Sequence, residues 1–595
     1  MTDLNLGVIG NCQIASLIDS RGVMVWGCMP QFDGDPVFCR LLRSEEDRER
    51  PGYFEIELQD FERAEQEYVP NTPILRTTLY DRHGGAIAIT DFAPRYPYMG
   101  RMFRPMMLIR AIEPLSGSPR IRIRLNPARD YGRKACKTRR GSNHIRYLGS
   151  GMRLRLTTDV SITRVLDQSS FVLDRPVHLI LGPDESIPEA VSDTYHNHLE
   201  ATERFWRGWS RGLAIPFEWQ EAVIRAAITL KLCTFEDTGA VIAAMTTSIP
   251  EAAGSGRNWD YRYCWLRDSY FVVNVLNRLG ATKTMEEYLR YIIDVSTEAG
   301  LEELQPVYAI SGRADLTESV VESLSGYRGM GPVRLGNQAY EQNQHDVYGA
   351  VVLSSTQMFF DQRLTHPGGM AEFQLLEQLG AVAVRLYDQP DAGLWEYRGR
   401  KRVHTFSSLM CWAACDRLAR IATRLGLADR AAYWGRQASH IHKVICEQAW
   451  DDRQQAFTES FGRPEMDASL LMMHYLGFLK ADDPRFVGTV NAIEKQLRRG
   501  HHVFRYAAAD DFGEPENAFN ICTFWYIDAL ASIGREEEAR ELYEHMLSCR
   551  NPLGMLSEDI DSRDNSLWGN FPQTYSMAGI IDGAMRLSKS WAEAI

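Results

Sequence analysis

The stretch Arg257-Asn-Trp-Asp-Tyr-Arg-Tyr-Cys-Trp-Leu-Arg-Asp-Ser269 brings four aromatic side chains, three arginines and two aspartates together within thirteen residues. An apolar helical run, Phe271-Val-Val-Asn-Val-Leu-Asn-Arg-Leu279, follows it directly. An amphipathic helix needs one apolar stripe and a polar back, and it does not need so many rings and charges at its first turn. Taken alone, the stretch fits either an aromatic plug with an Arg267–Asp268 ion pair or the wall of a polar site.

Helical periodicity dominates the chain from Trp219 to its end. The spacing of apolar residues predicts twelve helices: 219–235, 268–279, 283–297, 345–360, 373–387, 406–424, 428–449, 468–477, 486–498, 518–533, 536–548 and 575–594. Twelve helices suit six antiparallel hairpins closed into a ring, an (α/α)6 barrel. A two-layer solenoid is the alternative, but the sequence has no repeat of about 34 to 47 residues to favour it.

In such an alternating ring, the connections after odd-numbered helices all emerge at one end. Five of them are rich in aromatic residues, glycine and carboxylates: the opening stretch, 324–337, 391–399, 504–517 and 553–572. Connections after even-numbered helices, such as 280–282, 425–427 and 534–535, are short and plain. This asymmetry predicts a site on one rim of a rigid scaffold.

The first part of the chain has the pattern of short β-strands. Segments rich in β-branched and aromatic residues occur at 23–27, 53–58, 86–92, 106–112, 121–125, 152–156 and 177–181. Several alternate between apolar and polar residues, and turn residues such as those at 81–85 separate them, which is typical of an antiparallel β-sandwich. We interpret the arginines of 120–140 as outward-facing strand positions rather than an anion site.

The expected organisation therefore has three parts. Residues 1–195 form an N-terminal antiparallel β-sandwich, and residues 217–595 form the (α/α)6 barrel, which we expect to be the catalytic domain. The polar, tryptophan-containing segment 196–216 between them is expected to be a linker helix region. A chain of 595 residues is too long for one ordinary core, in agreement with this division.

Composition excludes several classes of protein. The formal net charge of -12 argues against a nucleic-acid partner, because nucleic-acid binders are usually basic. No apolar run approaches the roughly 20 residues that span a bilayer, so no membrane partner is expected. The N-terminus lacks a signal-peptide pattern, and we expect a cytoplasmic protein. A neutral small molecule suits this composition better, and the oligomeric state is left open.

The cysteines do not indicate a metal centre. Eleven of them are scattered from Cys12 to Cys549, with no CxxC pair and no zinc-ligand spacing. Free, mostly buried thiols in a reducing compartment are the simplest interpretation. We therefore expect no metal ligands and no cofactor.

The residue types at the predicted rim suit a sugar. Aromatic faces stack on sugar C–H patches, and charged groups hydrogen-bond to hydroxyls. Cleavage of a glycosidic bond needs a carboxylic acid to protonate the leaving oxygen and a carboxylate across from it. We select Glu396 and Glu558, which lie on two well-separated rim connections. Trp395 would shield Glu396 from water, and Ser557 would hydrogen-bond beside Glu558.

Six motifs in order along the chain also resemble a known family. They are Asn258-Trp-Asp-Tyr-Arg-Tyr-Cys-Trp-Leu-Arg-Asp268, Ser325-Gly-Tyr-Arg-Gly329 with Val333-Arg-Leu-Gly-Asn337, Gly393-Leu-Trp-Glu-Tyr-Arg-Gly399, Arg505-Tyr506, Leu556-Ser-Glu-Asp-Ile-Asp561 and Gly569-Asn-Phe-Pro-Gln-Thr-Tyr-Ser576. With these motifs the chain resembles the family 15 glycoside hydrolases, the glucoamylases and microbial trehalases. The resemblance covers the β-sandwich, the linker and the barrel.

The resemblance implies an inverting exo-α-glucosidase that releases β-glucose from trehalose or short malto-oligosaccharides. It makes Glu396 the general acid and Glu558 the general base that activates water. The residues it implies for glucose binding are Tyr261, Trp265, Arg267, Asp268, Trp395 and Arg505. The chain departs from the fungal glucoamylases at Tyr397, where they have glutamate, and this changes the neighbouring subsite.

Two alternatives remain at this point. A phosphorylase on the same barrel would need a phosphate site in place of the base, and a carboxylate at Glu558 would repel phosphate. A non-catalytic carbohydrate-binding protein would use the aromatic rim without two carboxylates on separate loops. The expected partner in every case is a small carbohydrate.

Overall fold

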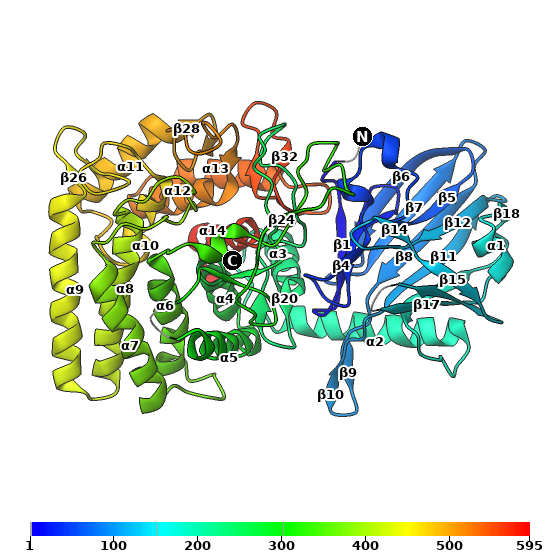
Figure 1. Cartoon of the computed structure of the whole chain (residues 1–595), viewed down its shortest axis with the longest axis horizontal. Helices are drawn as coiled ribbons and strands as arrows, with labels where there is room; N and C mark the ends of the chain where they lie inside the picture. Colours follow the sequence, from blue (N-terminus) through cyan, green and yellow to red (C-terminus); the bar gives the residue numbers. More distant parts are fainter. Residues whose placement is uncertain (1–2, 150–151, 301–302, 595) are drawn as a thin grey trace.

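Figure 1 shows the computed structural model, which describes residues 3–149, 152–300 and 303–594. Two bodies of different architecture lie side by side: a β domain in the first part of the chain and a helical domain in the rest. Helix α2 (Val191–Arg211) runs along one side of the β domain and leads to the helical one. It begins at Val191, a few residues before the expected start of the linker at His196.

The β domain consists of two antiparallel sheets, as expected for a β-sandwich. One sheet contains, in spatial order, β1 (Gly7–Gly10), β2 (Ala15–Ile18), β3 (Met24–Met29), β5 (Tyr53–Leu58), β12 (Arg120–Asn126) and β18 (Phe171–Val172), with β4 (Asp35–Phe38) on β3. The other contains β15 (Lys137–Arg140), β16 (His144–Leu148), β17 (Arg153–Thr158), β19 (Val177–Pro183), β11 (Leu108–Ser116), β8 (Ala86–Phe92), β7 (Leu75–Asp81) and β6 (Phe61–Tyr68).

Strand β12 shows how alternation selects the buried face. Ile121, Ile123 and Leu125 are buried in the core, while the arginines between them face outward. Arg122 and Arg124 pair with glutamates of the neighbouring strand β5, at 3.3 Å and 3.2 Å. The prediction that these arginines occupy outward-facing strand positions is confirmed.

The helical domain is a double ring, which confirms the predicted (α/α)6 barrel. The inner ring runs through α4 (Leu266–Arg278), α6 (Asp346–Phe360), α8 (Thr405–Arg424), η4 (Ala468–Leu471) with α10 (Met472–Tyr475), α12 (Asn520–Ser532) and α14 (Thr574–Leu587), and α14 contacts α4 again. The outer helices are α3 (Gln220–Leu232), α5 (Thr282–Ala299), α7 (Met370–Leu386), α9 (Ala428–Gln448), α11 (Pro484–Leu497) and α13 (Glu536–Ser548).

Apolar patterning separates the inner from the outer helices. Nearly every side chain of α6 and α12 is buried, as expected for helices with neighbours on all sides. Outer helix α9 buries one stripe only, formed by Trp434, Ala438, Ile441 and Ile445. Two predicted helices differ from the structure. The segment 468–477 is a 3-10 turn followed by one α-helical turn, and 575–594 divides at Ser588 into α14 and α15 (Trp591–Ala594).

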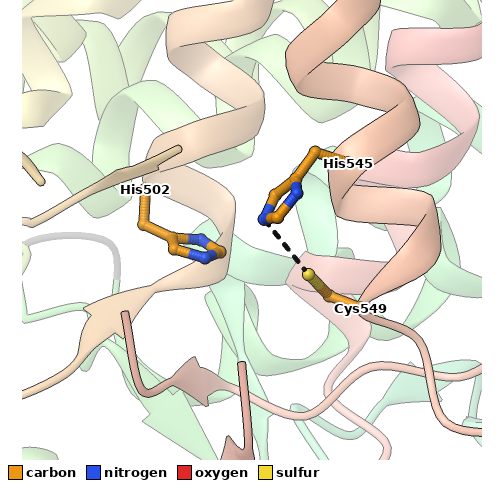
Figure 2. A group of neighbouring side chains, drawn as sticks. All are labelled: His502, His545 and Cys549. Carbon is orange, nitrogen blue, oxygen red and sulfur yellow. Dashed lines mark hydrogen bonds between the residues drawn. The ribbon is translucent and has the colours of Figure 1, made fainter. Parts of the chain in front are cut away.

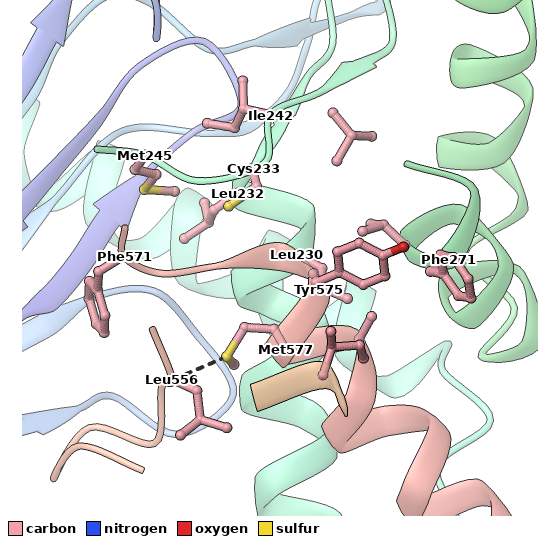
Figure 3. Packing of buried hydrophobic residues seen from close by; sticks show 14 of the residues in the cluster. Leu230, Leu232, Cys233, Ile242, Met245, Phe271, Leu556, Phe571, Tyr575 and Met577 are labelled. Atoms are coloured by element: carbon pink, nitrogen blue, oxygen red, sulfur yellow. Dashed lines mark hydrogen bonds between the residues drawn. The ribbon is translucent and has the colours of Figure 1, made fainter. Parts of the chain in front are cut away.

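The core beneath the barrel rim ties the rim connections to the helices. Figure 3 shows Leu230 of α3, Phe271 of α4 and Tyr575 of α14 packed together. The backbone N–H of Leu556 donates to Met577 Sδ at 3.4 Å, which fixes the chain two residues before Glu558. The hydrophobic core therefore supports the rim connections from below.

Candidate active site

An open cavity lies where the rim connections converge. Seven of the eight residues selected from the sequence line it: Tyr261, Trp265, Arg267, Asp268, Trp395, Glu396 and Arg505. The eighth, Glu558, is fully buried behind the cavity lining and accepts a hydrogen bond from Tyr261, which lines the cavity. The structure therefore brings together all the predicted site residues, although they come from connections hundreds of residues apart.

Glu396 is held by three donors. Its Oε1 accepts a hydrogen bond from Trp265 Nε1 at 2.6 Å and from Gln344 Nε2 at 3.3 Å, and Arg267 Nη2 lies 3.5 Å away. Within the described residues, no protein donor meets Oε2, and the side chain is 22% exposed. Its backbone adopts a left-handed conformation with φ of 61°, which is uncommon for a residue other than glycine. One carboxylate oxygen is thus fixed, and the other faces the cavity without a protein donor among the described residues.

Glu558 lies in a different environment. Its Oε1 accepts a 2.6 Å hydrogen bond from the hydroxyl of Tyr261, and the backbone N–H of Asn570 lies 3.4 Å from Oε2. Gly569 has φ of 73°, and a Cβ there would come within 2.6 Å of the Glu558 Cβ, so glycine is required. Burial, reinforced by the negative charge of Glu251, raises the pKa of Glu558 to about 8.

The expected hydrogen bond from Ser557 to the Glu558 carboxylate does not form. The hydroxyl of Ser557 instead donates to the backbone carbonyl of Asp559 at 2.9 Å. Successive residues of this short extended segment point to opposite sides, so Ser557 faces away from the carboxylate. The hydroxyl that binds Glu558 comes from Tyr261 on another connection.

Arg267 and Asp268 form more than a simple ion pair. They lie in the first turn of α4, with Arg267 Nε 3.4 Å from Asp268 Oδ1. Arg267 Nη1 also donates to Gln344 at 2.8 Å and lies 3.2 Å from Asp346 in the first turn of α6. Burial raises the pKa of Asp268 to about 7, although Arg267 opposes this shift. These contacts hold the guanidinium of Arg267 in one orientation.

The opening stretch is anchored on its other side by the β domain. Arg262 binds Asp260 through Nε and Nη2 and donates to the carbonyl of Gly34 at 2.9 Å. Trp26 of β3 also donates to the carbonyl of Met245 at 2.7 Å. Side chains of the stretch alternate, so Arg262, held by Asp260, reaches the β domain while Tyr261 lines the cavity. The β-sandwich thus supports one wall of the site.

Family comparison identifies the chain. Residues 219–584 match the sequence pattern of "Glycosyl hydrolases family 15", and residues 4–165 match "Trehalase-like, N-terminal". The first match spans more than half of the chain. The chain belongs to glycosyl hydrolase family 15. The trehalase of Thermoplasma volcanium is 32% identical over 98% of this chain and 93% of its own length. The trehalase of Mycolicibacterium smegmatis is 31% identical over 99% of this chain and 91% of its own length.

The solved structures agree on the architecture of this family 15 protein. A bacterial glucoamylase complexed with acarbose aligns with a TM-score of 0.69 at 14% identity, covering 98% of this chain and 94% of the other. At that identity the likeness shows the fold. Membership of family 15 makes the protein a glycoside hydrolase, so the phosphorylase and the non-catalytic binding protein are set aside. Among the described residues, every helix falls short of what crossing a bilayer requires.

One acidic residue of this family 15 site was not predicted from the sequence. Glu251 lines the cavity and is only 5% exposed. Its Oε1 accepts from Trp259 Nε1 at 2.8 Å, and its Oε2 accepts from Arg505 Nη2 at 2.6 Å. It precedes the opening stretch by six residues, in the segment Ile249-Pro-Glu-Ala-Ala253. The sequence feature that could have indicated Glu251 is a single charged residue among small and apolar neighbours.

The sequence analysis also passed over one rim connection. The chain between α9 and η4 supplies Asp467, whose Oδ2 accepts a 2.7 Å hydrogen bond from Trp395 Nε1. Burial raises the pKa of Asp467 to about 6. This connection was not singled out from the sequence, although it contains Trp450, Phe457 and Phe461. All six connections of the rim therefore build the site.

Proposed function

We propose that this family 15 enzyme hydrolyses trehalose by inversion, with Glu396 as general acid and Glu558 as general base. The observation that carries the proposal is the pair of hydrogen bonds from one connection to both carboxylates: Tyr261 to Glu558 and Trp265 to Glu396, each 2.6 Å long. Relatives named trehalase, about as long as this chain, support the choice of substrate.

Glu396 would act at the leaving oxygen. The donors around Oε1 stabilise negative charge on that oxygen, so the proton sits on Oε2 and can pass to the glycosidic oxygen. After transfer, Trp265 and Arg267 already surround the carboxylate that forms. These groups need no reorganisation during the reaction, which is the arrangement that lowers a barrier most effectively.

Glu558 would take the proton from the attacking water. Tyr261 holds Oε1, and Oε2, next to the N–H of Asn570, would accept the proton of a water that enters with the substrate. An inverting enzyme needs about 6.5–9.5 Å between its two carboxyl groups so that water fits at the anomeric carbon. The two carboxylates lie on separate connections, and Tyr261 and Trp265 pack edge to face between them with centroids 5.2 Å apart.

The remaining predicted residues would bind the glucose whose bond is cleaved. Arg267 and Asp268 are buried, pre-oriented and line the cavity, so they suit hydrogen bonds to vicinal hydroxyls. Trp395 offers an indole face that its bond to Asp467 holds in place. Arg505 reaches the cavity from the connection that follows α11.

Glu251 extends this arrangement toward the second glucose. Trp259 and Arg505 hold its carboxylate at the cavity surface, beside the Glu558 that it influences electrostatically. We assign Glu251 a role in binding the leaving sugar and in setting the pKa of the base. Tyr397, which replaces the glutamate of fungal glucoamylases, lines the same cavity.

The boundaries of the three parts and the compartment are also proposals. We assign the β-sandwich to residues 1–195, the linker to 196–216 and the catalytic barrel to 217–595. The eleven cysteines all lie within the described residues and are free thiols, nine of them buried. Free thiols suit a reducing compartment such as the cytoplasm.

Glucose release from trehalose, maltose, isomaltose and maltoheptaose at equal concentration tests the proposed substrate. We expect the highest kcat/KM on trehalose. Higher kcat/KM on maltoheptaose would favour a glucan 1,4-α-glucosidase, the second candidate, which the fold of the bacterial glucoamylase supports. Activity on none of the four sugars would contradict the proposal.

A further inference from the structure

A cluster of metal-binding side chains lies outside the catalytic cavity. His545 and Cys549 are one helical turn apart at the end of α13, and His502 faces them from β29 (His502–Val503) (Figure 2). One potential ligand atom from each residue lies within 4.8 Å of the other two. Among the described residues, this is the one such group of three or more histidine, cysteine or acidic side chains.

The distances suit a tetrahedral metal ion. Cys549 Sγ lies 3.5 Å from His545 Nε2. A zinc ion about 2.3 Å from sulfur and about 2.0 Å from nitrogen would separate two such ligands by about 3.5 Å at tetrahedral angles. The His545–Cys549 pair already has this separation. The His502 ligand atom lies within 4.8 Å of the other two, and rotation of its ring about χ1 and χ2 can bring it closer to the pair.

The protonation of His502 supplies an independent argument. Its Nε2 lies 2.9 Å from Asn565 Oδ1, and because an amide oxygen only accepts, Nε2 carries the proton. Nδ1 therefore presents a lone pair. It is buried and has no hydrogen-bond partner among the described residues, and the side chain is 1% exposed. Metal-ligating histidines usually donate their second ring N–H to such an acceptor.

We propose that His502, His545 and Cys549 form a zinc site. Two imidazoles and a thiolate are ligands that favour Zn²⁺ over Mg²⁺ or Ca²⁺, which prefer oxygen. Binding replaces the Cys549 thiol proton with the metal, releases that proton to solvent and leaves one coordination position for water. No electron transfer is involved.

The position of the site gives the metal a structural role. His502 is three residues before Arg505, and Asn565 is seven residues after Glu558. Asn565 lies between β31 (Asp559–Ile560) and β32 (Leu567–Trp568), on the connection that carries the proposed base. Zinc would join the end of α13 to two connections of the active-site rim. We therefore expect Zn²⁺ to stabilise the fold, beyond the hydrolytic function proposed above.

The chain offers a matched control on another helix. His442 and Cys446 of α9 are also four residues apart, with Cys446 Sγ 3.7 Å from His442 Nδ1. His442 Nε2 already contacts the carbonyl of Phe478 at 3.2 Å, and among the described residues this pair does not belong to a group of three potential ligands. This second pair tests whether any His–Cys helical turn binds zinc or only the turn that faces His502.

The experiment titrates chelator-treated full-length enzyme with Zn²⁺ against a chromophoric zinc indicator, and follows Tm with and without Zn²⁺. We expect one tight equivalent and a higher Tm for the wild type. His545→Ala and Cys549→Ser should each weaken binding at least 100-fold and abolish the Tm increase, whereas His442→Ala with Cys446→Ser should match the wild type. Co²⁺ should give a thiolate charge-transfer band that Cys549→Ser removes.

Two results would overturn the proposal. One is a wild type that fails to take up one equivalent of Zn²⁺ ahead of the indicator. The other is retention of tight binding by both His545→Ala and Cys549→Ser. Because His545 is partly exposed and Cys549→Ser is nearly isosteric, at least one folded variant is expected. Trehalose hydrolysis is measured separately, so failure of the metal site leaves the catalytic proposal unaffected.

Discussion

The hydroxyl of Tyr261 donates a 2.6 Å hydrogen bond to the buried carboxylate of Glu558, 297 residues further along the chain. Four residues after Tyr261, Trp265 donates a bond of equal length to Glu396. A single connection at the end of α3 therefore positions both proposed catalytic carboxylates. The same connection is anchored to the β domain through Arg262, so the sandwich helps to hold the proposed catalytic residues in place.

Removal of the Tyr261 hydroxyl should weaken the base. The hydrogen bond stabilises ionised Glu558, so Tyr261→Phe should raise the pKa of Glu558 further and move the acidic limb of the kcat/KM profile to higher pH. A hydrogen bond to a charged group contributes about 1.5–3 kcal/mol, which corresponds to roughly 10- to 100-fold in rate. Steady-state kinetics from pH 5 to 9 measure both effects. An unchanged profile would show that Tyr261 does not control the base.

Neutralisation of Glu251 should move the acidic limb of the kcat/KM profile to lower pH. The Glu251 charge raises the pKa of Glu558, so Glu251→Gln should lower that pKa and extend activity to lower pH. KM should rise as well, because Glu251 lines the cavity and is held there by Arg505. Glu514→Gln, an exposed position on the connection after α11, is the control. A shift of the limb to higher pH in Glu251→Gln would contradict this assignment.

The buried base should reduce stability at alkaline pH. The pKa of Glu558 is higher in the folded state than in the unfolded chain, so the folded state binds more protons and stability falls as pH rises between about 5 and 8. Glu558→Gln removes this dependence. Denaturant unfolding should find the variant more stable than the wild type at pH 9, by on the order of 5 kcal/mol, and similar to it at pH 5. The prediction would be contradicted if the free energies of unfolding of variant and wild type differed by the same amount at pH 5 and at pH 9.

The proposed acid and base can be separated by the leaving group. Glu396→Gln and Glu558→Gln should each reduce hydrolysis of trehalose by several orders of magnitude. α-Glucosyl fluoride needs little protonation of its leaving group, so Glu396→Gln should retain substantial activity on it, whereas Glu558→Gln should not. Circular dichroism checks that both variants fold. If Glu558→Gln kept activity on α-glucosyl fluoride and Glu396→Gln lost it, Glu558 would be the acid and Glu396 the base.

Much of this structure was predictable because its signals are local. The alternation of Ile121, Ile123 and Leu125 defines a strand, and the buried stripe of α9 defines an outer helix. The dense motif around Arg267 marked one rim of the barrel. Helix boundaries agreed to within a few residues, except at Ser588, where a terminal helix divides in two.

Interactions between distant connections were less predictable. Ser557 was expected beside the Glu558 carboxylate because it is adjacent in sequence, but the hydroxyl there belongs to Tyr261. Glu251 and Asp467 lie in segments with no unusual composition, and only the fold brings them to Arg505 and Trp395. Such contacts depend on side-chain directions that periodicity does not specify.

The most direct test of the central claim follows the anomers that fresh enzyme releases from trehalose. Proton NMR in the first minutes, before mutarotation, distinguishes the two glucose units. Inversion by Glu396 and Glu558 predicts equal initial amounts of α- and β-glucose, because the attacked sugar inverts while the leaving sugar keeps its α configuration. Initial release of α-glucose alone would demonstrate retention through a covalent intermediate and would contradict the account.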